Sequence, residues 1–306
     1  MSGNPRLGTR GSPLAMIQAR KIASALEVVE RWPAGHVEIV PVKTSGDKIT
    51  DRPLAEVGGK ALWTKELDAA LLAGDVDFCV HSMKDVEAVR PPEIRLAAIR
   101  PRLYVEDKLI GADSIDDLKE GAVVGTSSPR RAAQLLAARS DLKIVSLRGN
   151  VDTRLKKLDA GEVDATILSA AGLHRLGMDH VGKAIPFDVM LPAPGQGALG
   201  VECRAVDTEC MQLLKHLDDS TSRSAVMAER AFARALGGSC HSPVAALATV
   251  EKGQVLLRAE ILSADGRDRI RDEARFPCGK EEPAAELARA MLERAPQSIR
   301  SLFAAA

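Results

Sequence analysis

A short apolar run that ends abruptly in charged residues constrains the fold of this chain more than any other feature. Residues 78–86 read FCVHSMKDV, so a predicted strand over 75–80 leads directly into a turn that contains Ser82, Lys84 and Asp85. A buried strand that ends in this way places donors, a cation and a carboxylate at a sheet edge, where α/β proteins bind ligands. The simpler alternative is that Asp85 caps the next element and that Lys84 is solvated.

The order of strand, polar turn and helix recurs along the chain, and it predicts an α/β fold. Near the start, Arg10 follows a predicted strand and precedes a helix that begins at Ser12 and Pro13. A guanidinium group beside the free N–H groups of a helix start makes an anion site, although a solvated arginine in a plain turn fits the same spacing. Gly58-Gly59-Lys60 is a weaker signal of the same kind.

Three later strands, predicted over 122–125, 143–147 and 165–168, also end in turns with basic or hydroxyl groups. The strongest signal is 126–131, where hydroxyl groups and two adjacent arginines at a helix start predict an oxyanion cradle. Each turn alone could be a solvated loop, but their shared position favours a site for a polyanion with carboxylate or phosphate groups. The residues are Thr126, Ser128, Arg130, Arg131, Arg148, Gly149, Arg154 and Arg175.

Breaks in this pattern predict a division into domains. Domain 1 is predicted over 1–99 plus 199–217 and domain 2 over 104–193, as two hinged α/β lobes. Domain 3 is predicted over 220–306, as a small α+β domain with a three-stranded sheet and helices. Cys240 lies on its glycine-rich entry loop, where it could be reactive or structural.

Composition narrows the class of protein. Positive and negative residues balance at 42 each and aromatic residues make up 3% of the chain, which disfavours nucleic acid as a partner. The polar N-terminus and the absence of an apolar run of roughly 20 residues predict a cytoplasmic protein without a membrane segment. Five widely spaced cysteines with no CxxC pair argue against disulfides and against a metal site. The polar stretch 43–52 is a candidate lid.

Taken together, eight motifs closely resemble the porphobilinogen deaminase (hydroxymethylbilane synthase) family over essentially the whole length. They are Arg10-Gly11-Ser12-Pro13-Leu14-Ala15, Val57-Gly58-Gly59-Lys60, His81-Ser82-Met83-Lys84-Asp85, Gly125-Thr126-Ser127-Ser128 with Arg130-Arg131, Leu147-Arg148-Gly149-Asn150-Val151, Ala171-Gly172-Leu173, Pro194-Gly195-Gln196-Gly197 and Gly238-Ser239-Cys240.

The resemblance implies three domains, of which the first two are like the lobes of periplasmic binding proteins. It implies a dipyrromethane cofactor attached by a thioether to Cys240. The family joins four porphobilinogen molecules head to tail, releases ammonia at each step and hydrolyses the product from the cofactor as hydroxymethylbilane. Each pyrrole carries an acetate and a propionate, which explains the many arginines. A monomer is expected, with the product passed to uroporphyrinogen III synthase.

The resemblance also implies roles for single residues. Asp85 matches the catalytic aspartate, which would stabilise the azafulvenium-like cation left by loss of ammonia and relay a proton. The cofactor would be bound by Ser82, Lys84, Thr126, Ser128, Arg130, Arg131, Arg148 and Gly149. The substrate would be bound by Arg10, Ser12, Lys60, Arg148, Arg154, Arg175 and Gln196; Lys84 is also expected to contact the substrate, and Arg175 and Gln196 the cofactor.

Three departures from the family pattern stand out. Residues 102–108 read RLYVEDK where the family usually has Arg-x-Asp-Pro-Arg-Asp-Ala, so Glu106 replaces a positive charge. Trp63 replaces a phenylalanine, and Pro129 lies within the arginine cradle. Because Asp85 and Cys240 are intact, we expect an active enzyme with altered hinge behaviour. The alternative is a binding or sensor protein that traps an anion between two lobes without chemistry.

Overall fold

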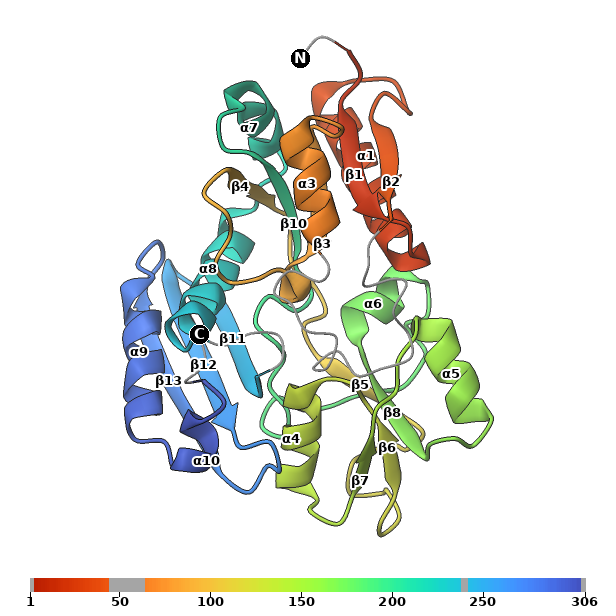
Figure 1. Ribbon diagram of the computed structural model, residues 1–306, viewed down its shortest axis with the longest axis vertical. Coiled ribbons are helices and arrows are strands. Elements are labelled where there is room, and N and C mark those ends of the chain that lie inside the picture. The colour runs from red at the N-terminus through yellow and green to blue at the C-terminus, as the bar shows by residue number, and fades with distance from the viewer. Residues whose placement is uncertain (1–2, 44–63, 238–241, 304–306) are drawn as a thin grey trace. The chain divides into compact units, whose positions relative to one another are not determined.

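The computed structural model describes residues 3–43, 64–237 and 242–303 (Figure 1). These residues form two compact units. The first contains residues 3–43, 64–103 and 198–223, and the second contains the described residues of 104–197 and 224–303. The second lobe and the C-terminal domain therefore lie within one unit, while the predicted boundaries of three domains stay a prediction.

The described part of the first unit is built on a five-stranded sheet in the order β2-β1-β3-β10-β4. β1 is parallel to β2 and to β3, whereas β10 is antiparallel to both β3 and β4. The chain thus leaves this sheet after β4 and returns to it with β10 (Figure 1). The strands are β1 (Arg6–Arg10), β2 (Glu38–Val42), β3 (Phe78–Ser82), β4 (Ile94–Ile99) and β10 (Leu199–Arg204).

Helices cover this sheet and bury its apolar side chains. The Ser12 hydroxyl caps α1 by accepting from the Ala15 N–H, and Pro13 occupies the first turn, as predicted. Leu26 of α1 packs in one core cluster with Leu7 and Phe78, and full burial of each such side chain contributes roughly 1.5–3 kcal/mol. The helices are α1 (Pro13–Glu30), α3 (Lys65–Ala73), the 3-10 turn η1 (Met83–Asp85), α7 (Thr208–Lys215) and α8 (Ser220–Ala235), which continues into the second unit.

β3 begins and ends later than the predicted strand over 75–80. It starts at Phe78 because Asp77 instead accepts from the Arg6 backbone N–H and side chain before the strand. It continues through His81 and Ser82 because these residues pair with Gly200 and Leu199 of β10, which are distant in sequence. The polar residues of the motif therefore begin inside the sheet.

The second unit contains a further five-stranded sheet, in the order β7-β6-β8-β5-β9 within the described residues. β6 is parallel to β7 and β8, and β5 is antiparallel to β8. Sequence reasoning placed the first strand here at 122, so it missed β5 and β9, and it interpreted the start of α6 as a turn. The elements are β5 (Asp107–Ile110), β6 (Val123–Gly125), α4 (Pro129–Ala138), β7 (Lys143–Val145), α5 (Val151–Asp159), β8 (Ala165–Ser169), α6 (Ala170–Arg175) and β9 (Lys183–Ala184).

The C-terminal part confirms the predicted three-stranded sheet with helices, and the structure shows that its strands are antiparallel. Its core joins Phe232 of α8 to Phe276 of the sheet and Met291 of the last long helix. The elements are β11 (Val244–Glu251), β12 (Gln254–Leu262), β13 (Arg269–Pro277), α9 (Glu282–Glu293) and α10 (Gln297–Arg300). In the described ranges, none of the helices combines the length and the apolar character that a membrane crossing requires.

Candidate active site

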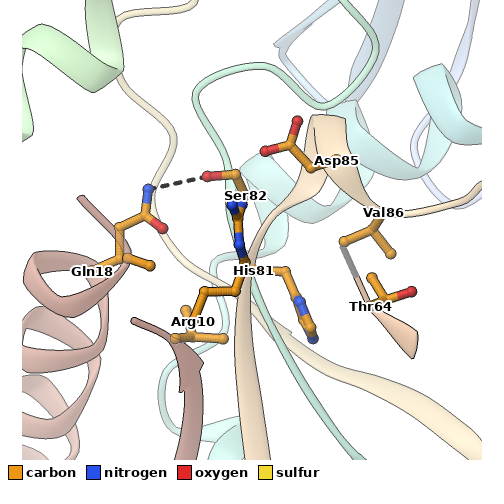
Figure 2. Close-up of a pocket in the computed structure, with 9 residues that line it drawn as sticks. Arg10, Gln18, Thr64, His81, Ser82, Asp85 and Val86 are labelled. Carbon is orange, nitrogen blue, oxygen red and sulfur yellow. Dashed lines mark hydrogen bonds between the residues drawn. The ribbon is translucent and has the colours of Figure 1, made fainter. Parts of the chain in front are cut away.

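The polar turn after β3 lines a pocket at the carboxyl edge of the first sheet. Because β1 and β3 are parallel, Arg10 at the end of one and Ser82 at the end of the other emerge at the same edge. Figure 2 shows the Arg10 side chain extending toward Ser82, with the Asp85 carboxylate at the same end of the pocket. The lining residues are Arg10, Ala15, Gln18, Thr64, Val80, His81, Ser82, Asp85 and Val86.

Gln18 fixes the hydroxyl group of Ser82 from the first helix. Its Nε2 donates to Ser82 Oγ at 3.0 Å, and its side chain is buried on the inner face of α1 (Figure 2). Sequence reasoning missed Gln18, although a glutamine on the apolar face of a helix is an available signal. The Ser12 hydroxyl caps the start of the same helix, where its Oγ accepts from the Ala15 N–H.

Lys84 and Asp85 lie in η1, which directly continues β3. The backbone of this turn is tied to the sheet, since the Met83 N–H donates to the Ala198 carbonyl at 3.1 Å. Met83 is buried directly over Gly200, where an added Cβ would lie 2.1 Å from the methionine sulfur. Lys84 and Asp85 themselves are half-buried. The turn is thus anchored by its first residue while its charged residues keep access to solvent.

Asp107 is the centre of the polar residues in the second unit. The carboxylate is 1% exposed, accepting from Arg130 Nη2 at 2.8 Å on one oxygen and from Arg131 Nη2 at 2.6 Å on the other. Gln196 Nε2 donates to the same carboxylate at 2.9 Å. Burial lowers the pKa of Arg130, and the nearby Asp107 charge opposes that change.

The two arginines of the predicted oxyanion cradle at 126–131 are buried and already take part in hydrogen bonds within the unit, and their role in binding a ligand stays a prediction. Arg130 and Arg131 are 4% and 6% exposed. Arg130 also donates to the Leu191 carbonyl, and Arg131 donates to the Ile167 carbonyl. Asp107 pairs with both guanidinium groups, so this single carboxylate balances one of their two positive charges. Each arginine nevertheless retains a buried Nε–H without a hydrogen-bond partner among the described residues.

The hydroxyl groups of the same turn serve the start of α4. Ser128 Oγ accepts from the Arg131 N–H as the helix cap, so α4 begins at Pro129, within the segment that the sequence predicted as a turn. The Thr126 hydroxyl is buried and accepts from the Ser128 N–H at 3.2 Å. These hydrogen bonds order the turn. A role of either hydroxyl group in binding a ligand stays a prediction.

Arg148, Gly149 and Arg154 lie close together at the start of α5. Arg154 Nε donates to the Gly149 carbonyl at 3.0 Å, and Arg148 is half-buried. Gly149 has φ +116°, and an added Cβ would lie 2.7 Å from the Thr153 side chain. Glycine is therefore required here on both conformational and steric grounds.

Arg175 lies at the end of α6 and is half-buried. Its Nη2 donates to the Gly197 carbonyl at 2.6 Å, and burial lowers its pKa to about 10. The side chain therefore remains a cation at neutral pH, with donors beyond the one that Gly197 uses. Together with the orphaned Nε–H groups of Arg130 and Arg131, this donor set fits a group that carries carboxylates.

The divergent run 102–108 contributes Asp107 and an unusual backbone. Tyr104 adopts φ 57°, a conformation uncommon for a bulky residue, and its ring stacks on His174 with centroids 4.4 Å apart. Altered hinge behaviour stays a prediction. Lys60, Trp63, Cys240 and all but the first residue of the candidate lid 43–52 lie outside the described residues.

Comparisons with known proteins agree along the length of the chain. Residues 6–212 match the family described as porphobilinogen deaminase, dipyromethane cofactor binding domain, and residues 224–294 match porphobilinogen deaminase, C-terminal domain. The porphobilinogen deaminase of Sphingopyxis alaskensis is 51% identical over 98% of this chain and 97% of its own length. That of Paracoccus denitrificans is 48% identical over 87% of each chain. A solved nutrient-binding protein from Burkholderia cenocepacia aligns over 74% of this chain and 94% of its own, at 16% identity and a TM-score of 0.42.

Proposed function

The chain belongs to the porphobilinogen deaminase family, and on that premise we propose that Asp85 is its catalytic carboxylate and that Cys240 carries its cofactor. The enzyme is a transferase that joins porphobilinogen molecules head to tail, with release of ammonia, and yields hydroxymethylbilane. Its cofactor is dipyrromethane.

One observation carries the assignment of Asp85. Of the described residues that line the pocket, Asp85 is the one carboxylate, and it stands beside the cation Arg10 and the hydroxyl of Ser82. Loss of ammonia leaves positive charge on the substrate, and a carboxylate at a partly buried position stabilises that charge more strongly than water does. The same carboxylate accepts a hydrogen bond from a pyrrole N–H and takes the proton that the ring loses when its carbon forms the new bond.

We propose that cationic and polar side chains within each unit bind and orient the carboxylates of the pyrrole rings. Arg10, Ser12 and Lys84 in the first unit, and Arg148, Arg154, Arg175 and Gln196 in the second, are proposed to contact the substrate. Guanidinium groups suit this task because they pair with a carboxylate through two parallel hydrogen bonds. Lys60 is proposed to join them, from outside the described residues.

The cofactor, when bound, supplies the pyrrole carbon to which the first substrate molecule is joined. The residues proposed to hold its carboxylates are Ser82, Lys84, Thr126, Ser128, Arg130, Arg131, Arg148 and Gly149, with further contacts from Arg175 and Gln196. The two orphaned Nε–H groups support Arg130 and Arg131, because a carboxylate would satisfy buried donors that otherwise cost free energy. A monomer and transfer of the product to uroporphyrinogen III synthase are proposed from the family resemblance, and a cytoplasmic location is proposed from the sequence pattern.

Intact mass spectrometry of the purified protein tests this function. We expect the wild-type mass to exceed the sequence mass by two deaminated pyrrole units, and Ehrlich's reagent to colour the protein. Cys240→Ser should show the bare sequence mass and no colour. Cys278→Ser is the matched control, and it should retain both the added mass and the colour. An unmodified wild-type mass in a preparation that consumes no porphobilinogen would overturn the proposal.

A further inference from the structure

Glu202 is a buried carboxylate that lies outside the residues lining the pocket. It projects from β10, the antiparallel neighbour of β3, and its exposed fraction is 0%. A charge in such a position is costly unless it is paired and hydrogen-bonded. Arg90 supplies that partner through two parallel hydrogen bonds, from Nε to Oε1 at 2.9 Å and from Nη2 to Oε2 at 2.8 Å.

His81 reaches the same carboxylate at Oε2, the oxygen that also accepts from Arg90 Nη2. Its Nε2 is buried 3.3 Å from Oε2 of Glu202, with an alignment that falls short of a hydrogen bond. His81 precedes Asp85 by four residues and Arg90 follows it by five. One carboxylate thus accepts hydrogen bonds from Arg90 at one end of the segment 81–90 and lies against His81 at the other, and Asp85 lies near the middle of the segment.

Other contacts of Arg90 tie this segment to a helix. Its Nη2 donates to Asp68 of α3 at 2.6 Å, and its Nη1 donates to Glu87 and to the Thr64 hydroxyl, both at 3.3 Å. Thr64 is itself a lining residue of the pocket. The segment is therefore fixed against the sheet by Glu202 and against α3 by Asp68.

The backbone of β10 is irregular where Glu202 lies. The register of β10 against β4 shifts between Val201 and Glu202, so that Ala97 of β4 has no partner in the ladder. Such bulges re-aim a side chain, and they are frequent beside active sites. Two residues earlier, Gly200 provides the space that Met83 of η1 occupies.

We propose that Glu202 is a positioning residue for the reaction: it holds His81 and Arg90 together, and thereby sets the place of the Asp85 carboxylate. The inference rests on the proposed role of Asp85. Small displacements of a catalytic group are expensive, since a shift of about 1 Å costs on the order of 100-fold in rate. Glu202 is not among the residues that line the described pocket, so we expect its loss to act on the chemical step rather than on the affinity for porphobilinogen.

A double-mutant cycle with Glu202→Gln and Asp85→Asn tests this coupling. In the wild-type background, we expect Glu202→Gln to lower kcat by about 10- to 100-fold while KM stays within about threefold. In the Asp85→Asn background, the same change should lower kcat by no more than about twofold, because the group that Glu202 positions is already lost. Intact mass of each variant checks that the cofactor is present.

Asp77→Asn is the matched control. Asp77 precedes the opposite end of β3 and lies between two arginines, Arg6 at 2.9 Å and Arg204 at 3.6 Å. We expect it to lower the melting temperature, as Glu202→Gln does, but to leave kcat unchanged. If Glu202→Gln does not fold, Arg90→Lys removes the paired hydrogen bonds while keeping the charge, and it should lower kcat in the same coupled manner.

The possible failures are distinguishable. The inference is overturned if Asp85→Asn is slow but Glu202→Gln, or Arg90→Lys in its place, keeps a normal kcat. It is also overturned if the loss in kcat is as large in the Asp85→Asn background as in the wild type, or if Asp77→Asn lowers kcat equally. A normal kcat for Asp85→Asn would instead overturn the proposed function itself.

Discussion

Two aspartates at strand ends, one in each unit, are used in opposite ways. Asp85 follows β3 in a half-buried turn and lines a pocket. Asp107 begins β5, is 1% exposed and accepts from Arg130, Arg131 and Gln196. A carboxylate whose oxygens are filled by guanidinium groups holds a fold together, whereas one that keeps access to a pocket is available for chemistry. Spacing in the sequence does not separate the two cases.

The largest expected effect on stability is at Asp107. Asp107→Ala leaves two buried guanidinium groups without their carboxylate, and removing one partner of a buried pair costs about 3–5 kcal/mol. The free energy of unfolding in urea measures this loss. The control is Asp113→Ala, which removes an exposed pair with Lys183 and should leave that free energy almost unchanged. Equal effects of the two changes would contradict the structural role of Asp107.

Glu202 is a third carboxylate, buried like Asp107, and its ionisation should make the stability of the folded state depend on pH. Burial alone would raise its pKa, but His81 and Arg90 outweigh burial and lower the pKa to about 2 from an ordinary 4.5. A carboxyl group whose pKa is lower in the folded state than in the unfolded chain stabilises the folded state at pH values above its unfolded pKa. Glu202 should therefore contribute about 3 kcal/mol to the free energy of unfolding above pH 4.5, and this contribution should be lost as the pH falls toward 2.

Urea unfolding of the wild type and of Glu202→Gln across that pH range checks this dependence. The difference in unfolding free energy between the two proteins should shrink as the pH falls. Protonation removes the negative charge of Glu202 in the wild type, and Glu202→Gln has already removed that charge. A difference that is constant from pH 5 downward would show that Glu202 does not titrate in this way.

A smaller effect is expected at Gly200, beneath the turn that carries Asp85. Gly200→Ala places a methyl group against the sulfur of Met83, which must move. Overpacking of this kind costs about 1–3 kcal/mol in stability, and we expect kcat to fall because η1 is displaced. Thermal unfolding and steady-state kinetics measure the two effects. Wild-type values of both would mean that the turn is not held by this contact.

The smallest effects compare the helix caps of the two units. Ser12→Ala and Ser128→Ala each remove a side-chain acceptor at a helix start, at a cost of about 1 kcal/mol in stability. Glycine at either position should restore most of that loss, since it is tolerated at a cap. Chemical denaturation of the four variants tests this, and a loss that glycine does not restore would assign the serine another structural role.

Much of the fold could be predicted because its signals are local. The start of α1 depends on Ser12 within one helical turn, and β12 and β13 follow from alternation between turns. β5 was missed because it is four residues long and begins with Asp107 and Lys108, so its charged start conceals the strand. Asp107 is buried only because arginines 23 and 24 residues later reach it.

The sequence located several residues of the candidate site, but it did not predict the contacts that these residues make. The strand end with Ser82 and Asp85 was located from sequence, whereas Gln18 lies 64 residues from its partner Ser82. Arg90 meets Glu202 across 112 residues, a separation that no motif spacing reveals. The adjacent arginines at 130 and 131 predicted a ligand site, but the structure shows them first as partners of Asp107.

The kcat of Asp85→Asn, with cofactor content verified by intact mass, tests the central claim most directly. Asparagine keeps the size of the side chain and removes its charge, so we expect a folded protein that releases ammonia from porphobilinogen at least about 100-fold more slowly, as loss of a charge-stabilising group costs about 3 kcal/mol. A loaded Asp85→Asn protein that turns over at close to the wild-type rate would contradict the claim that Asp85 is the catalytic carboxylate.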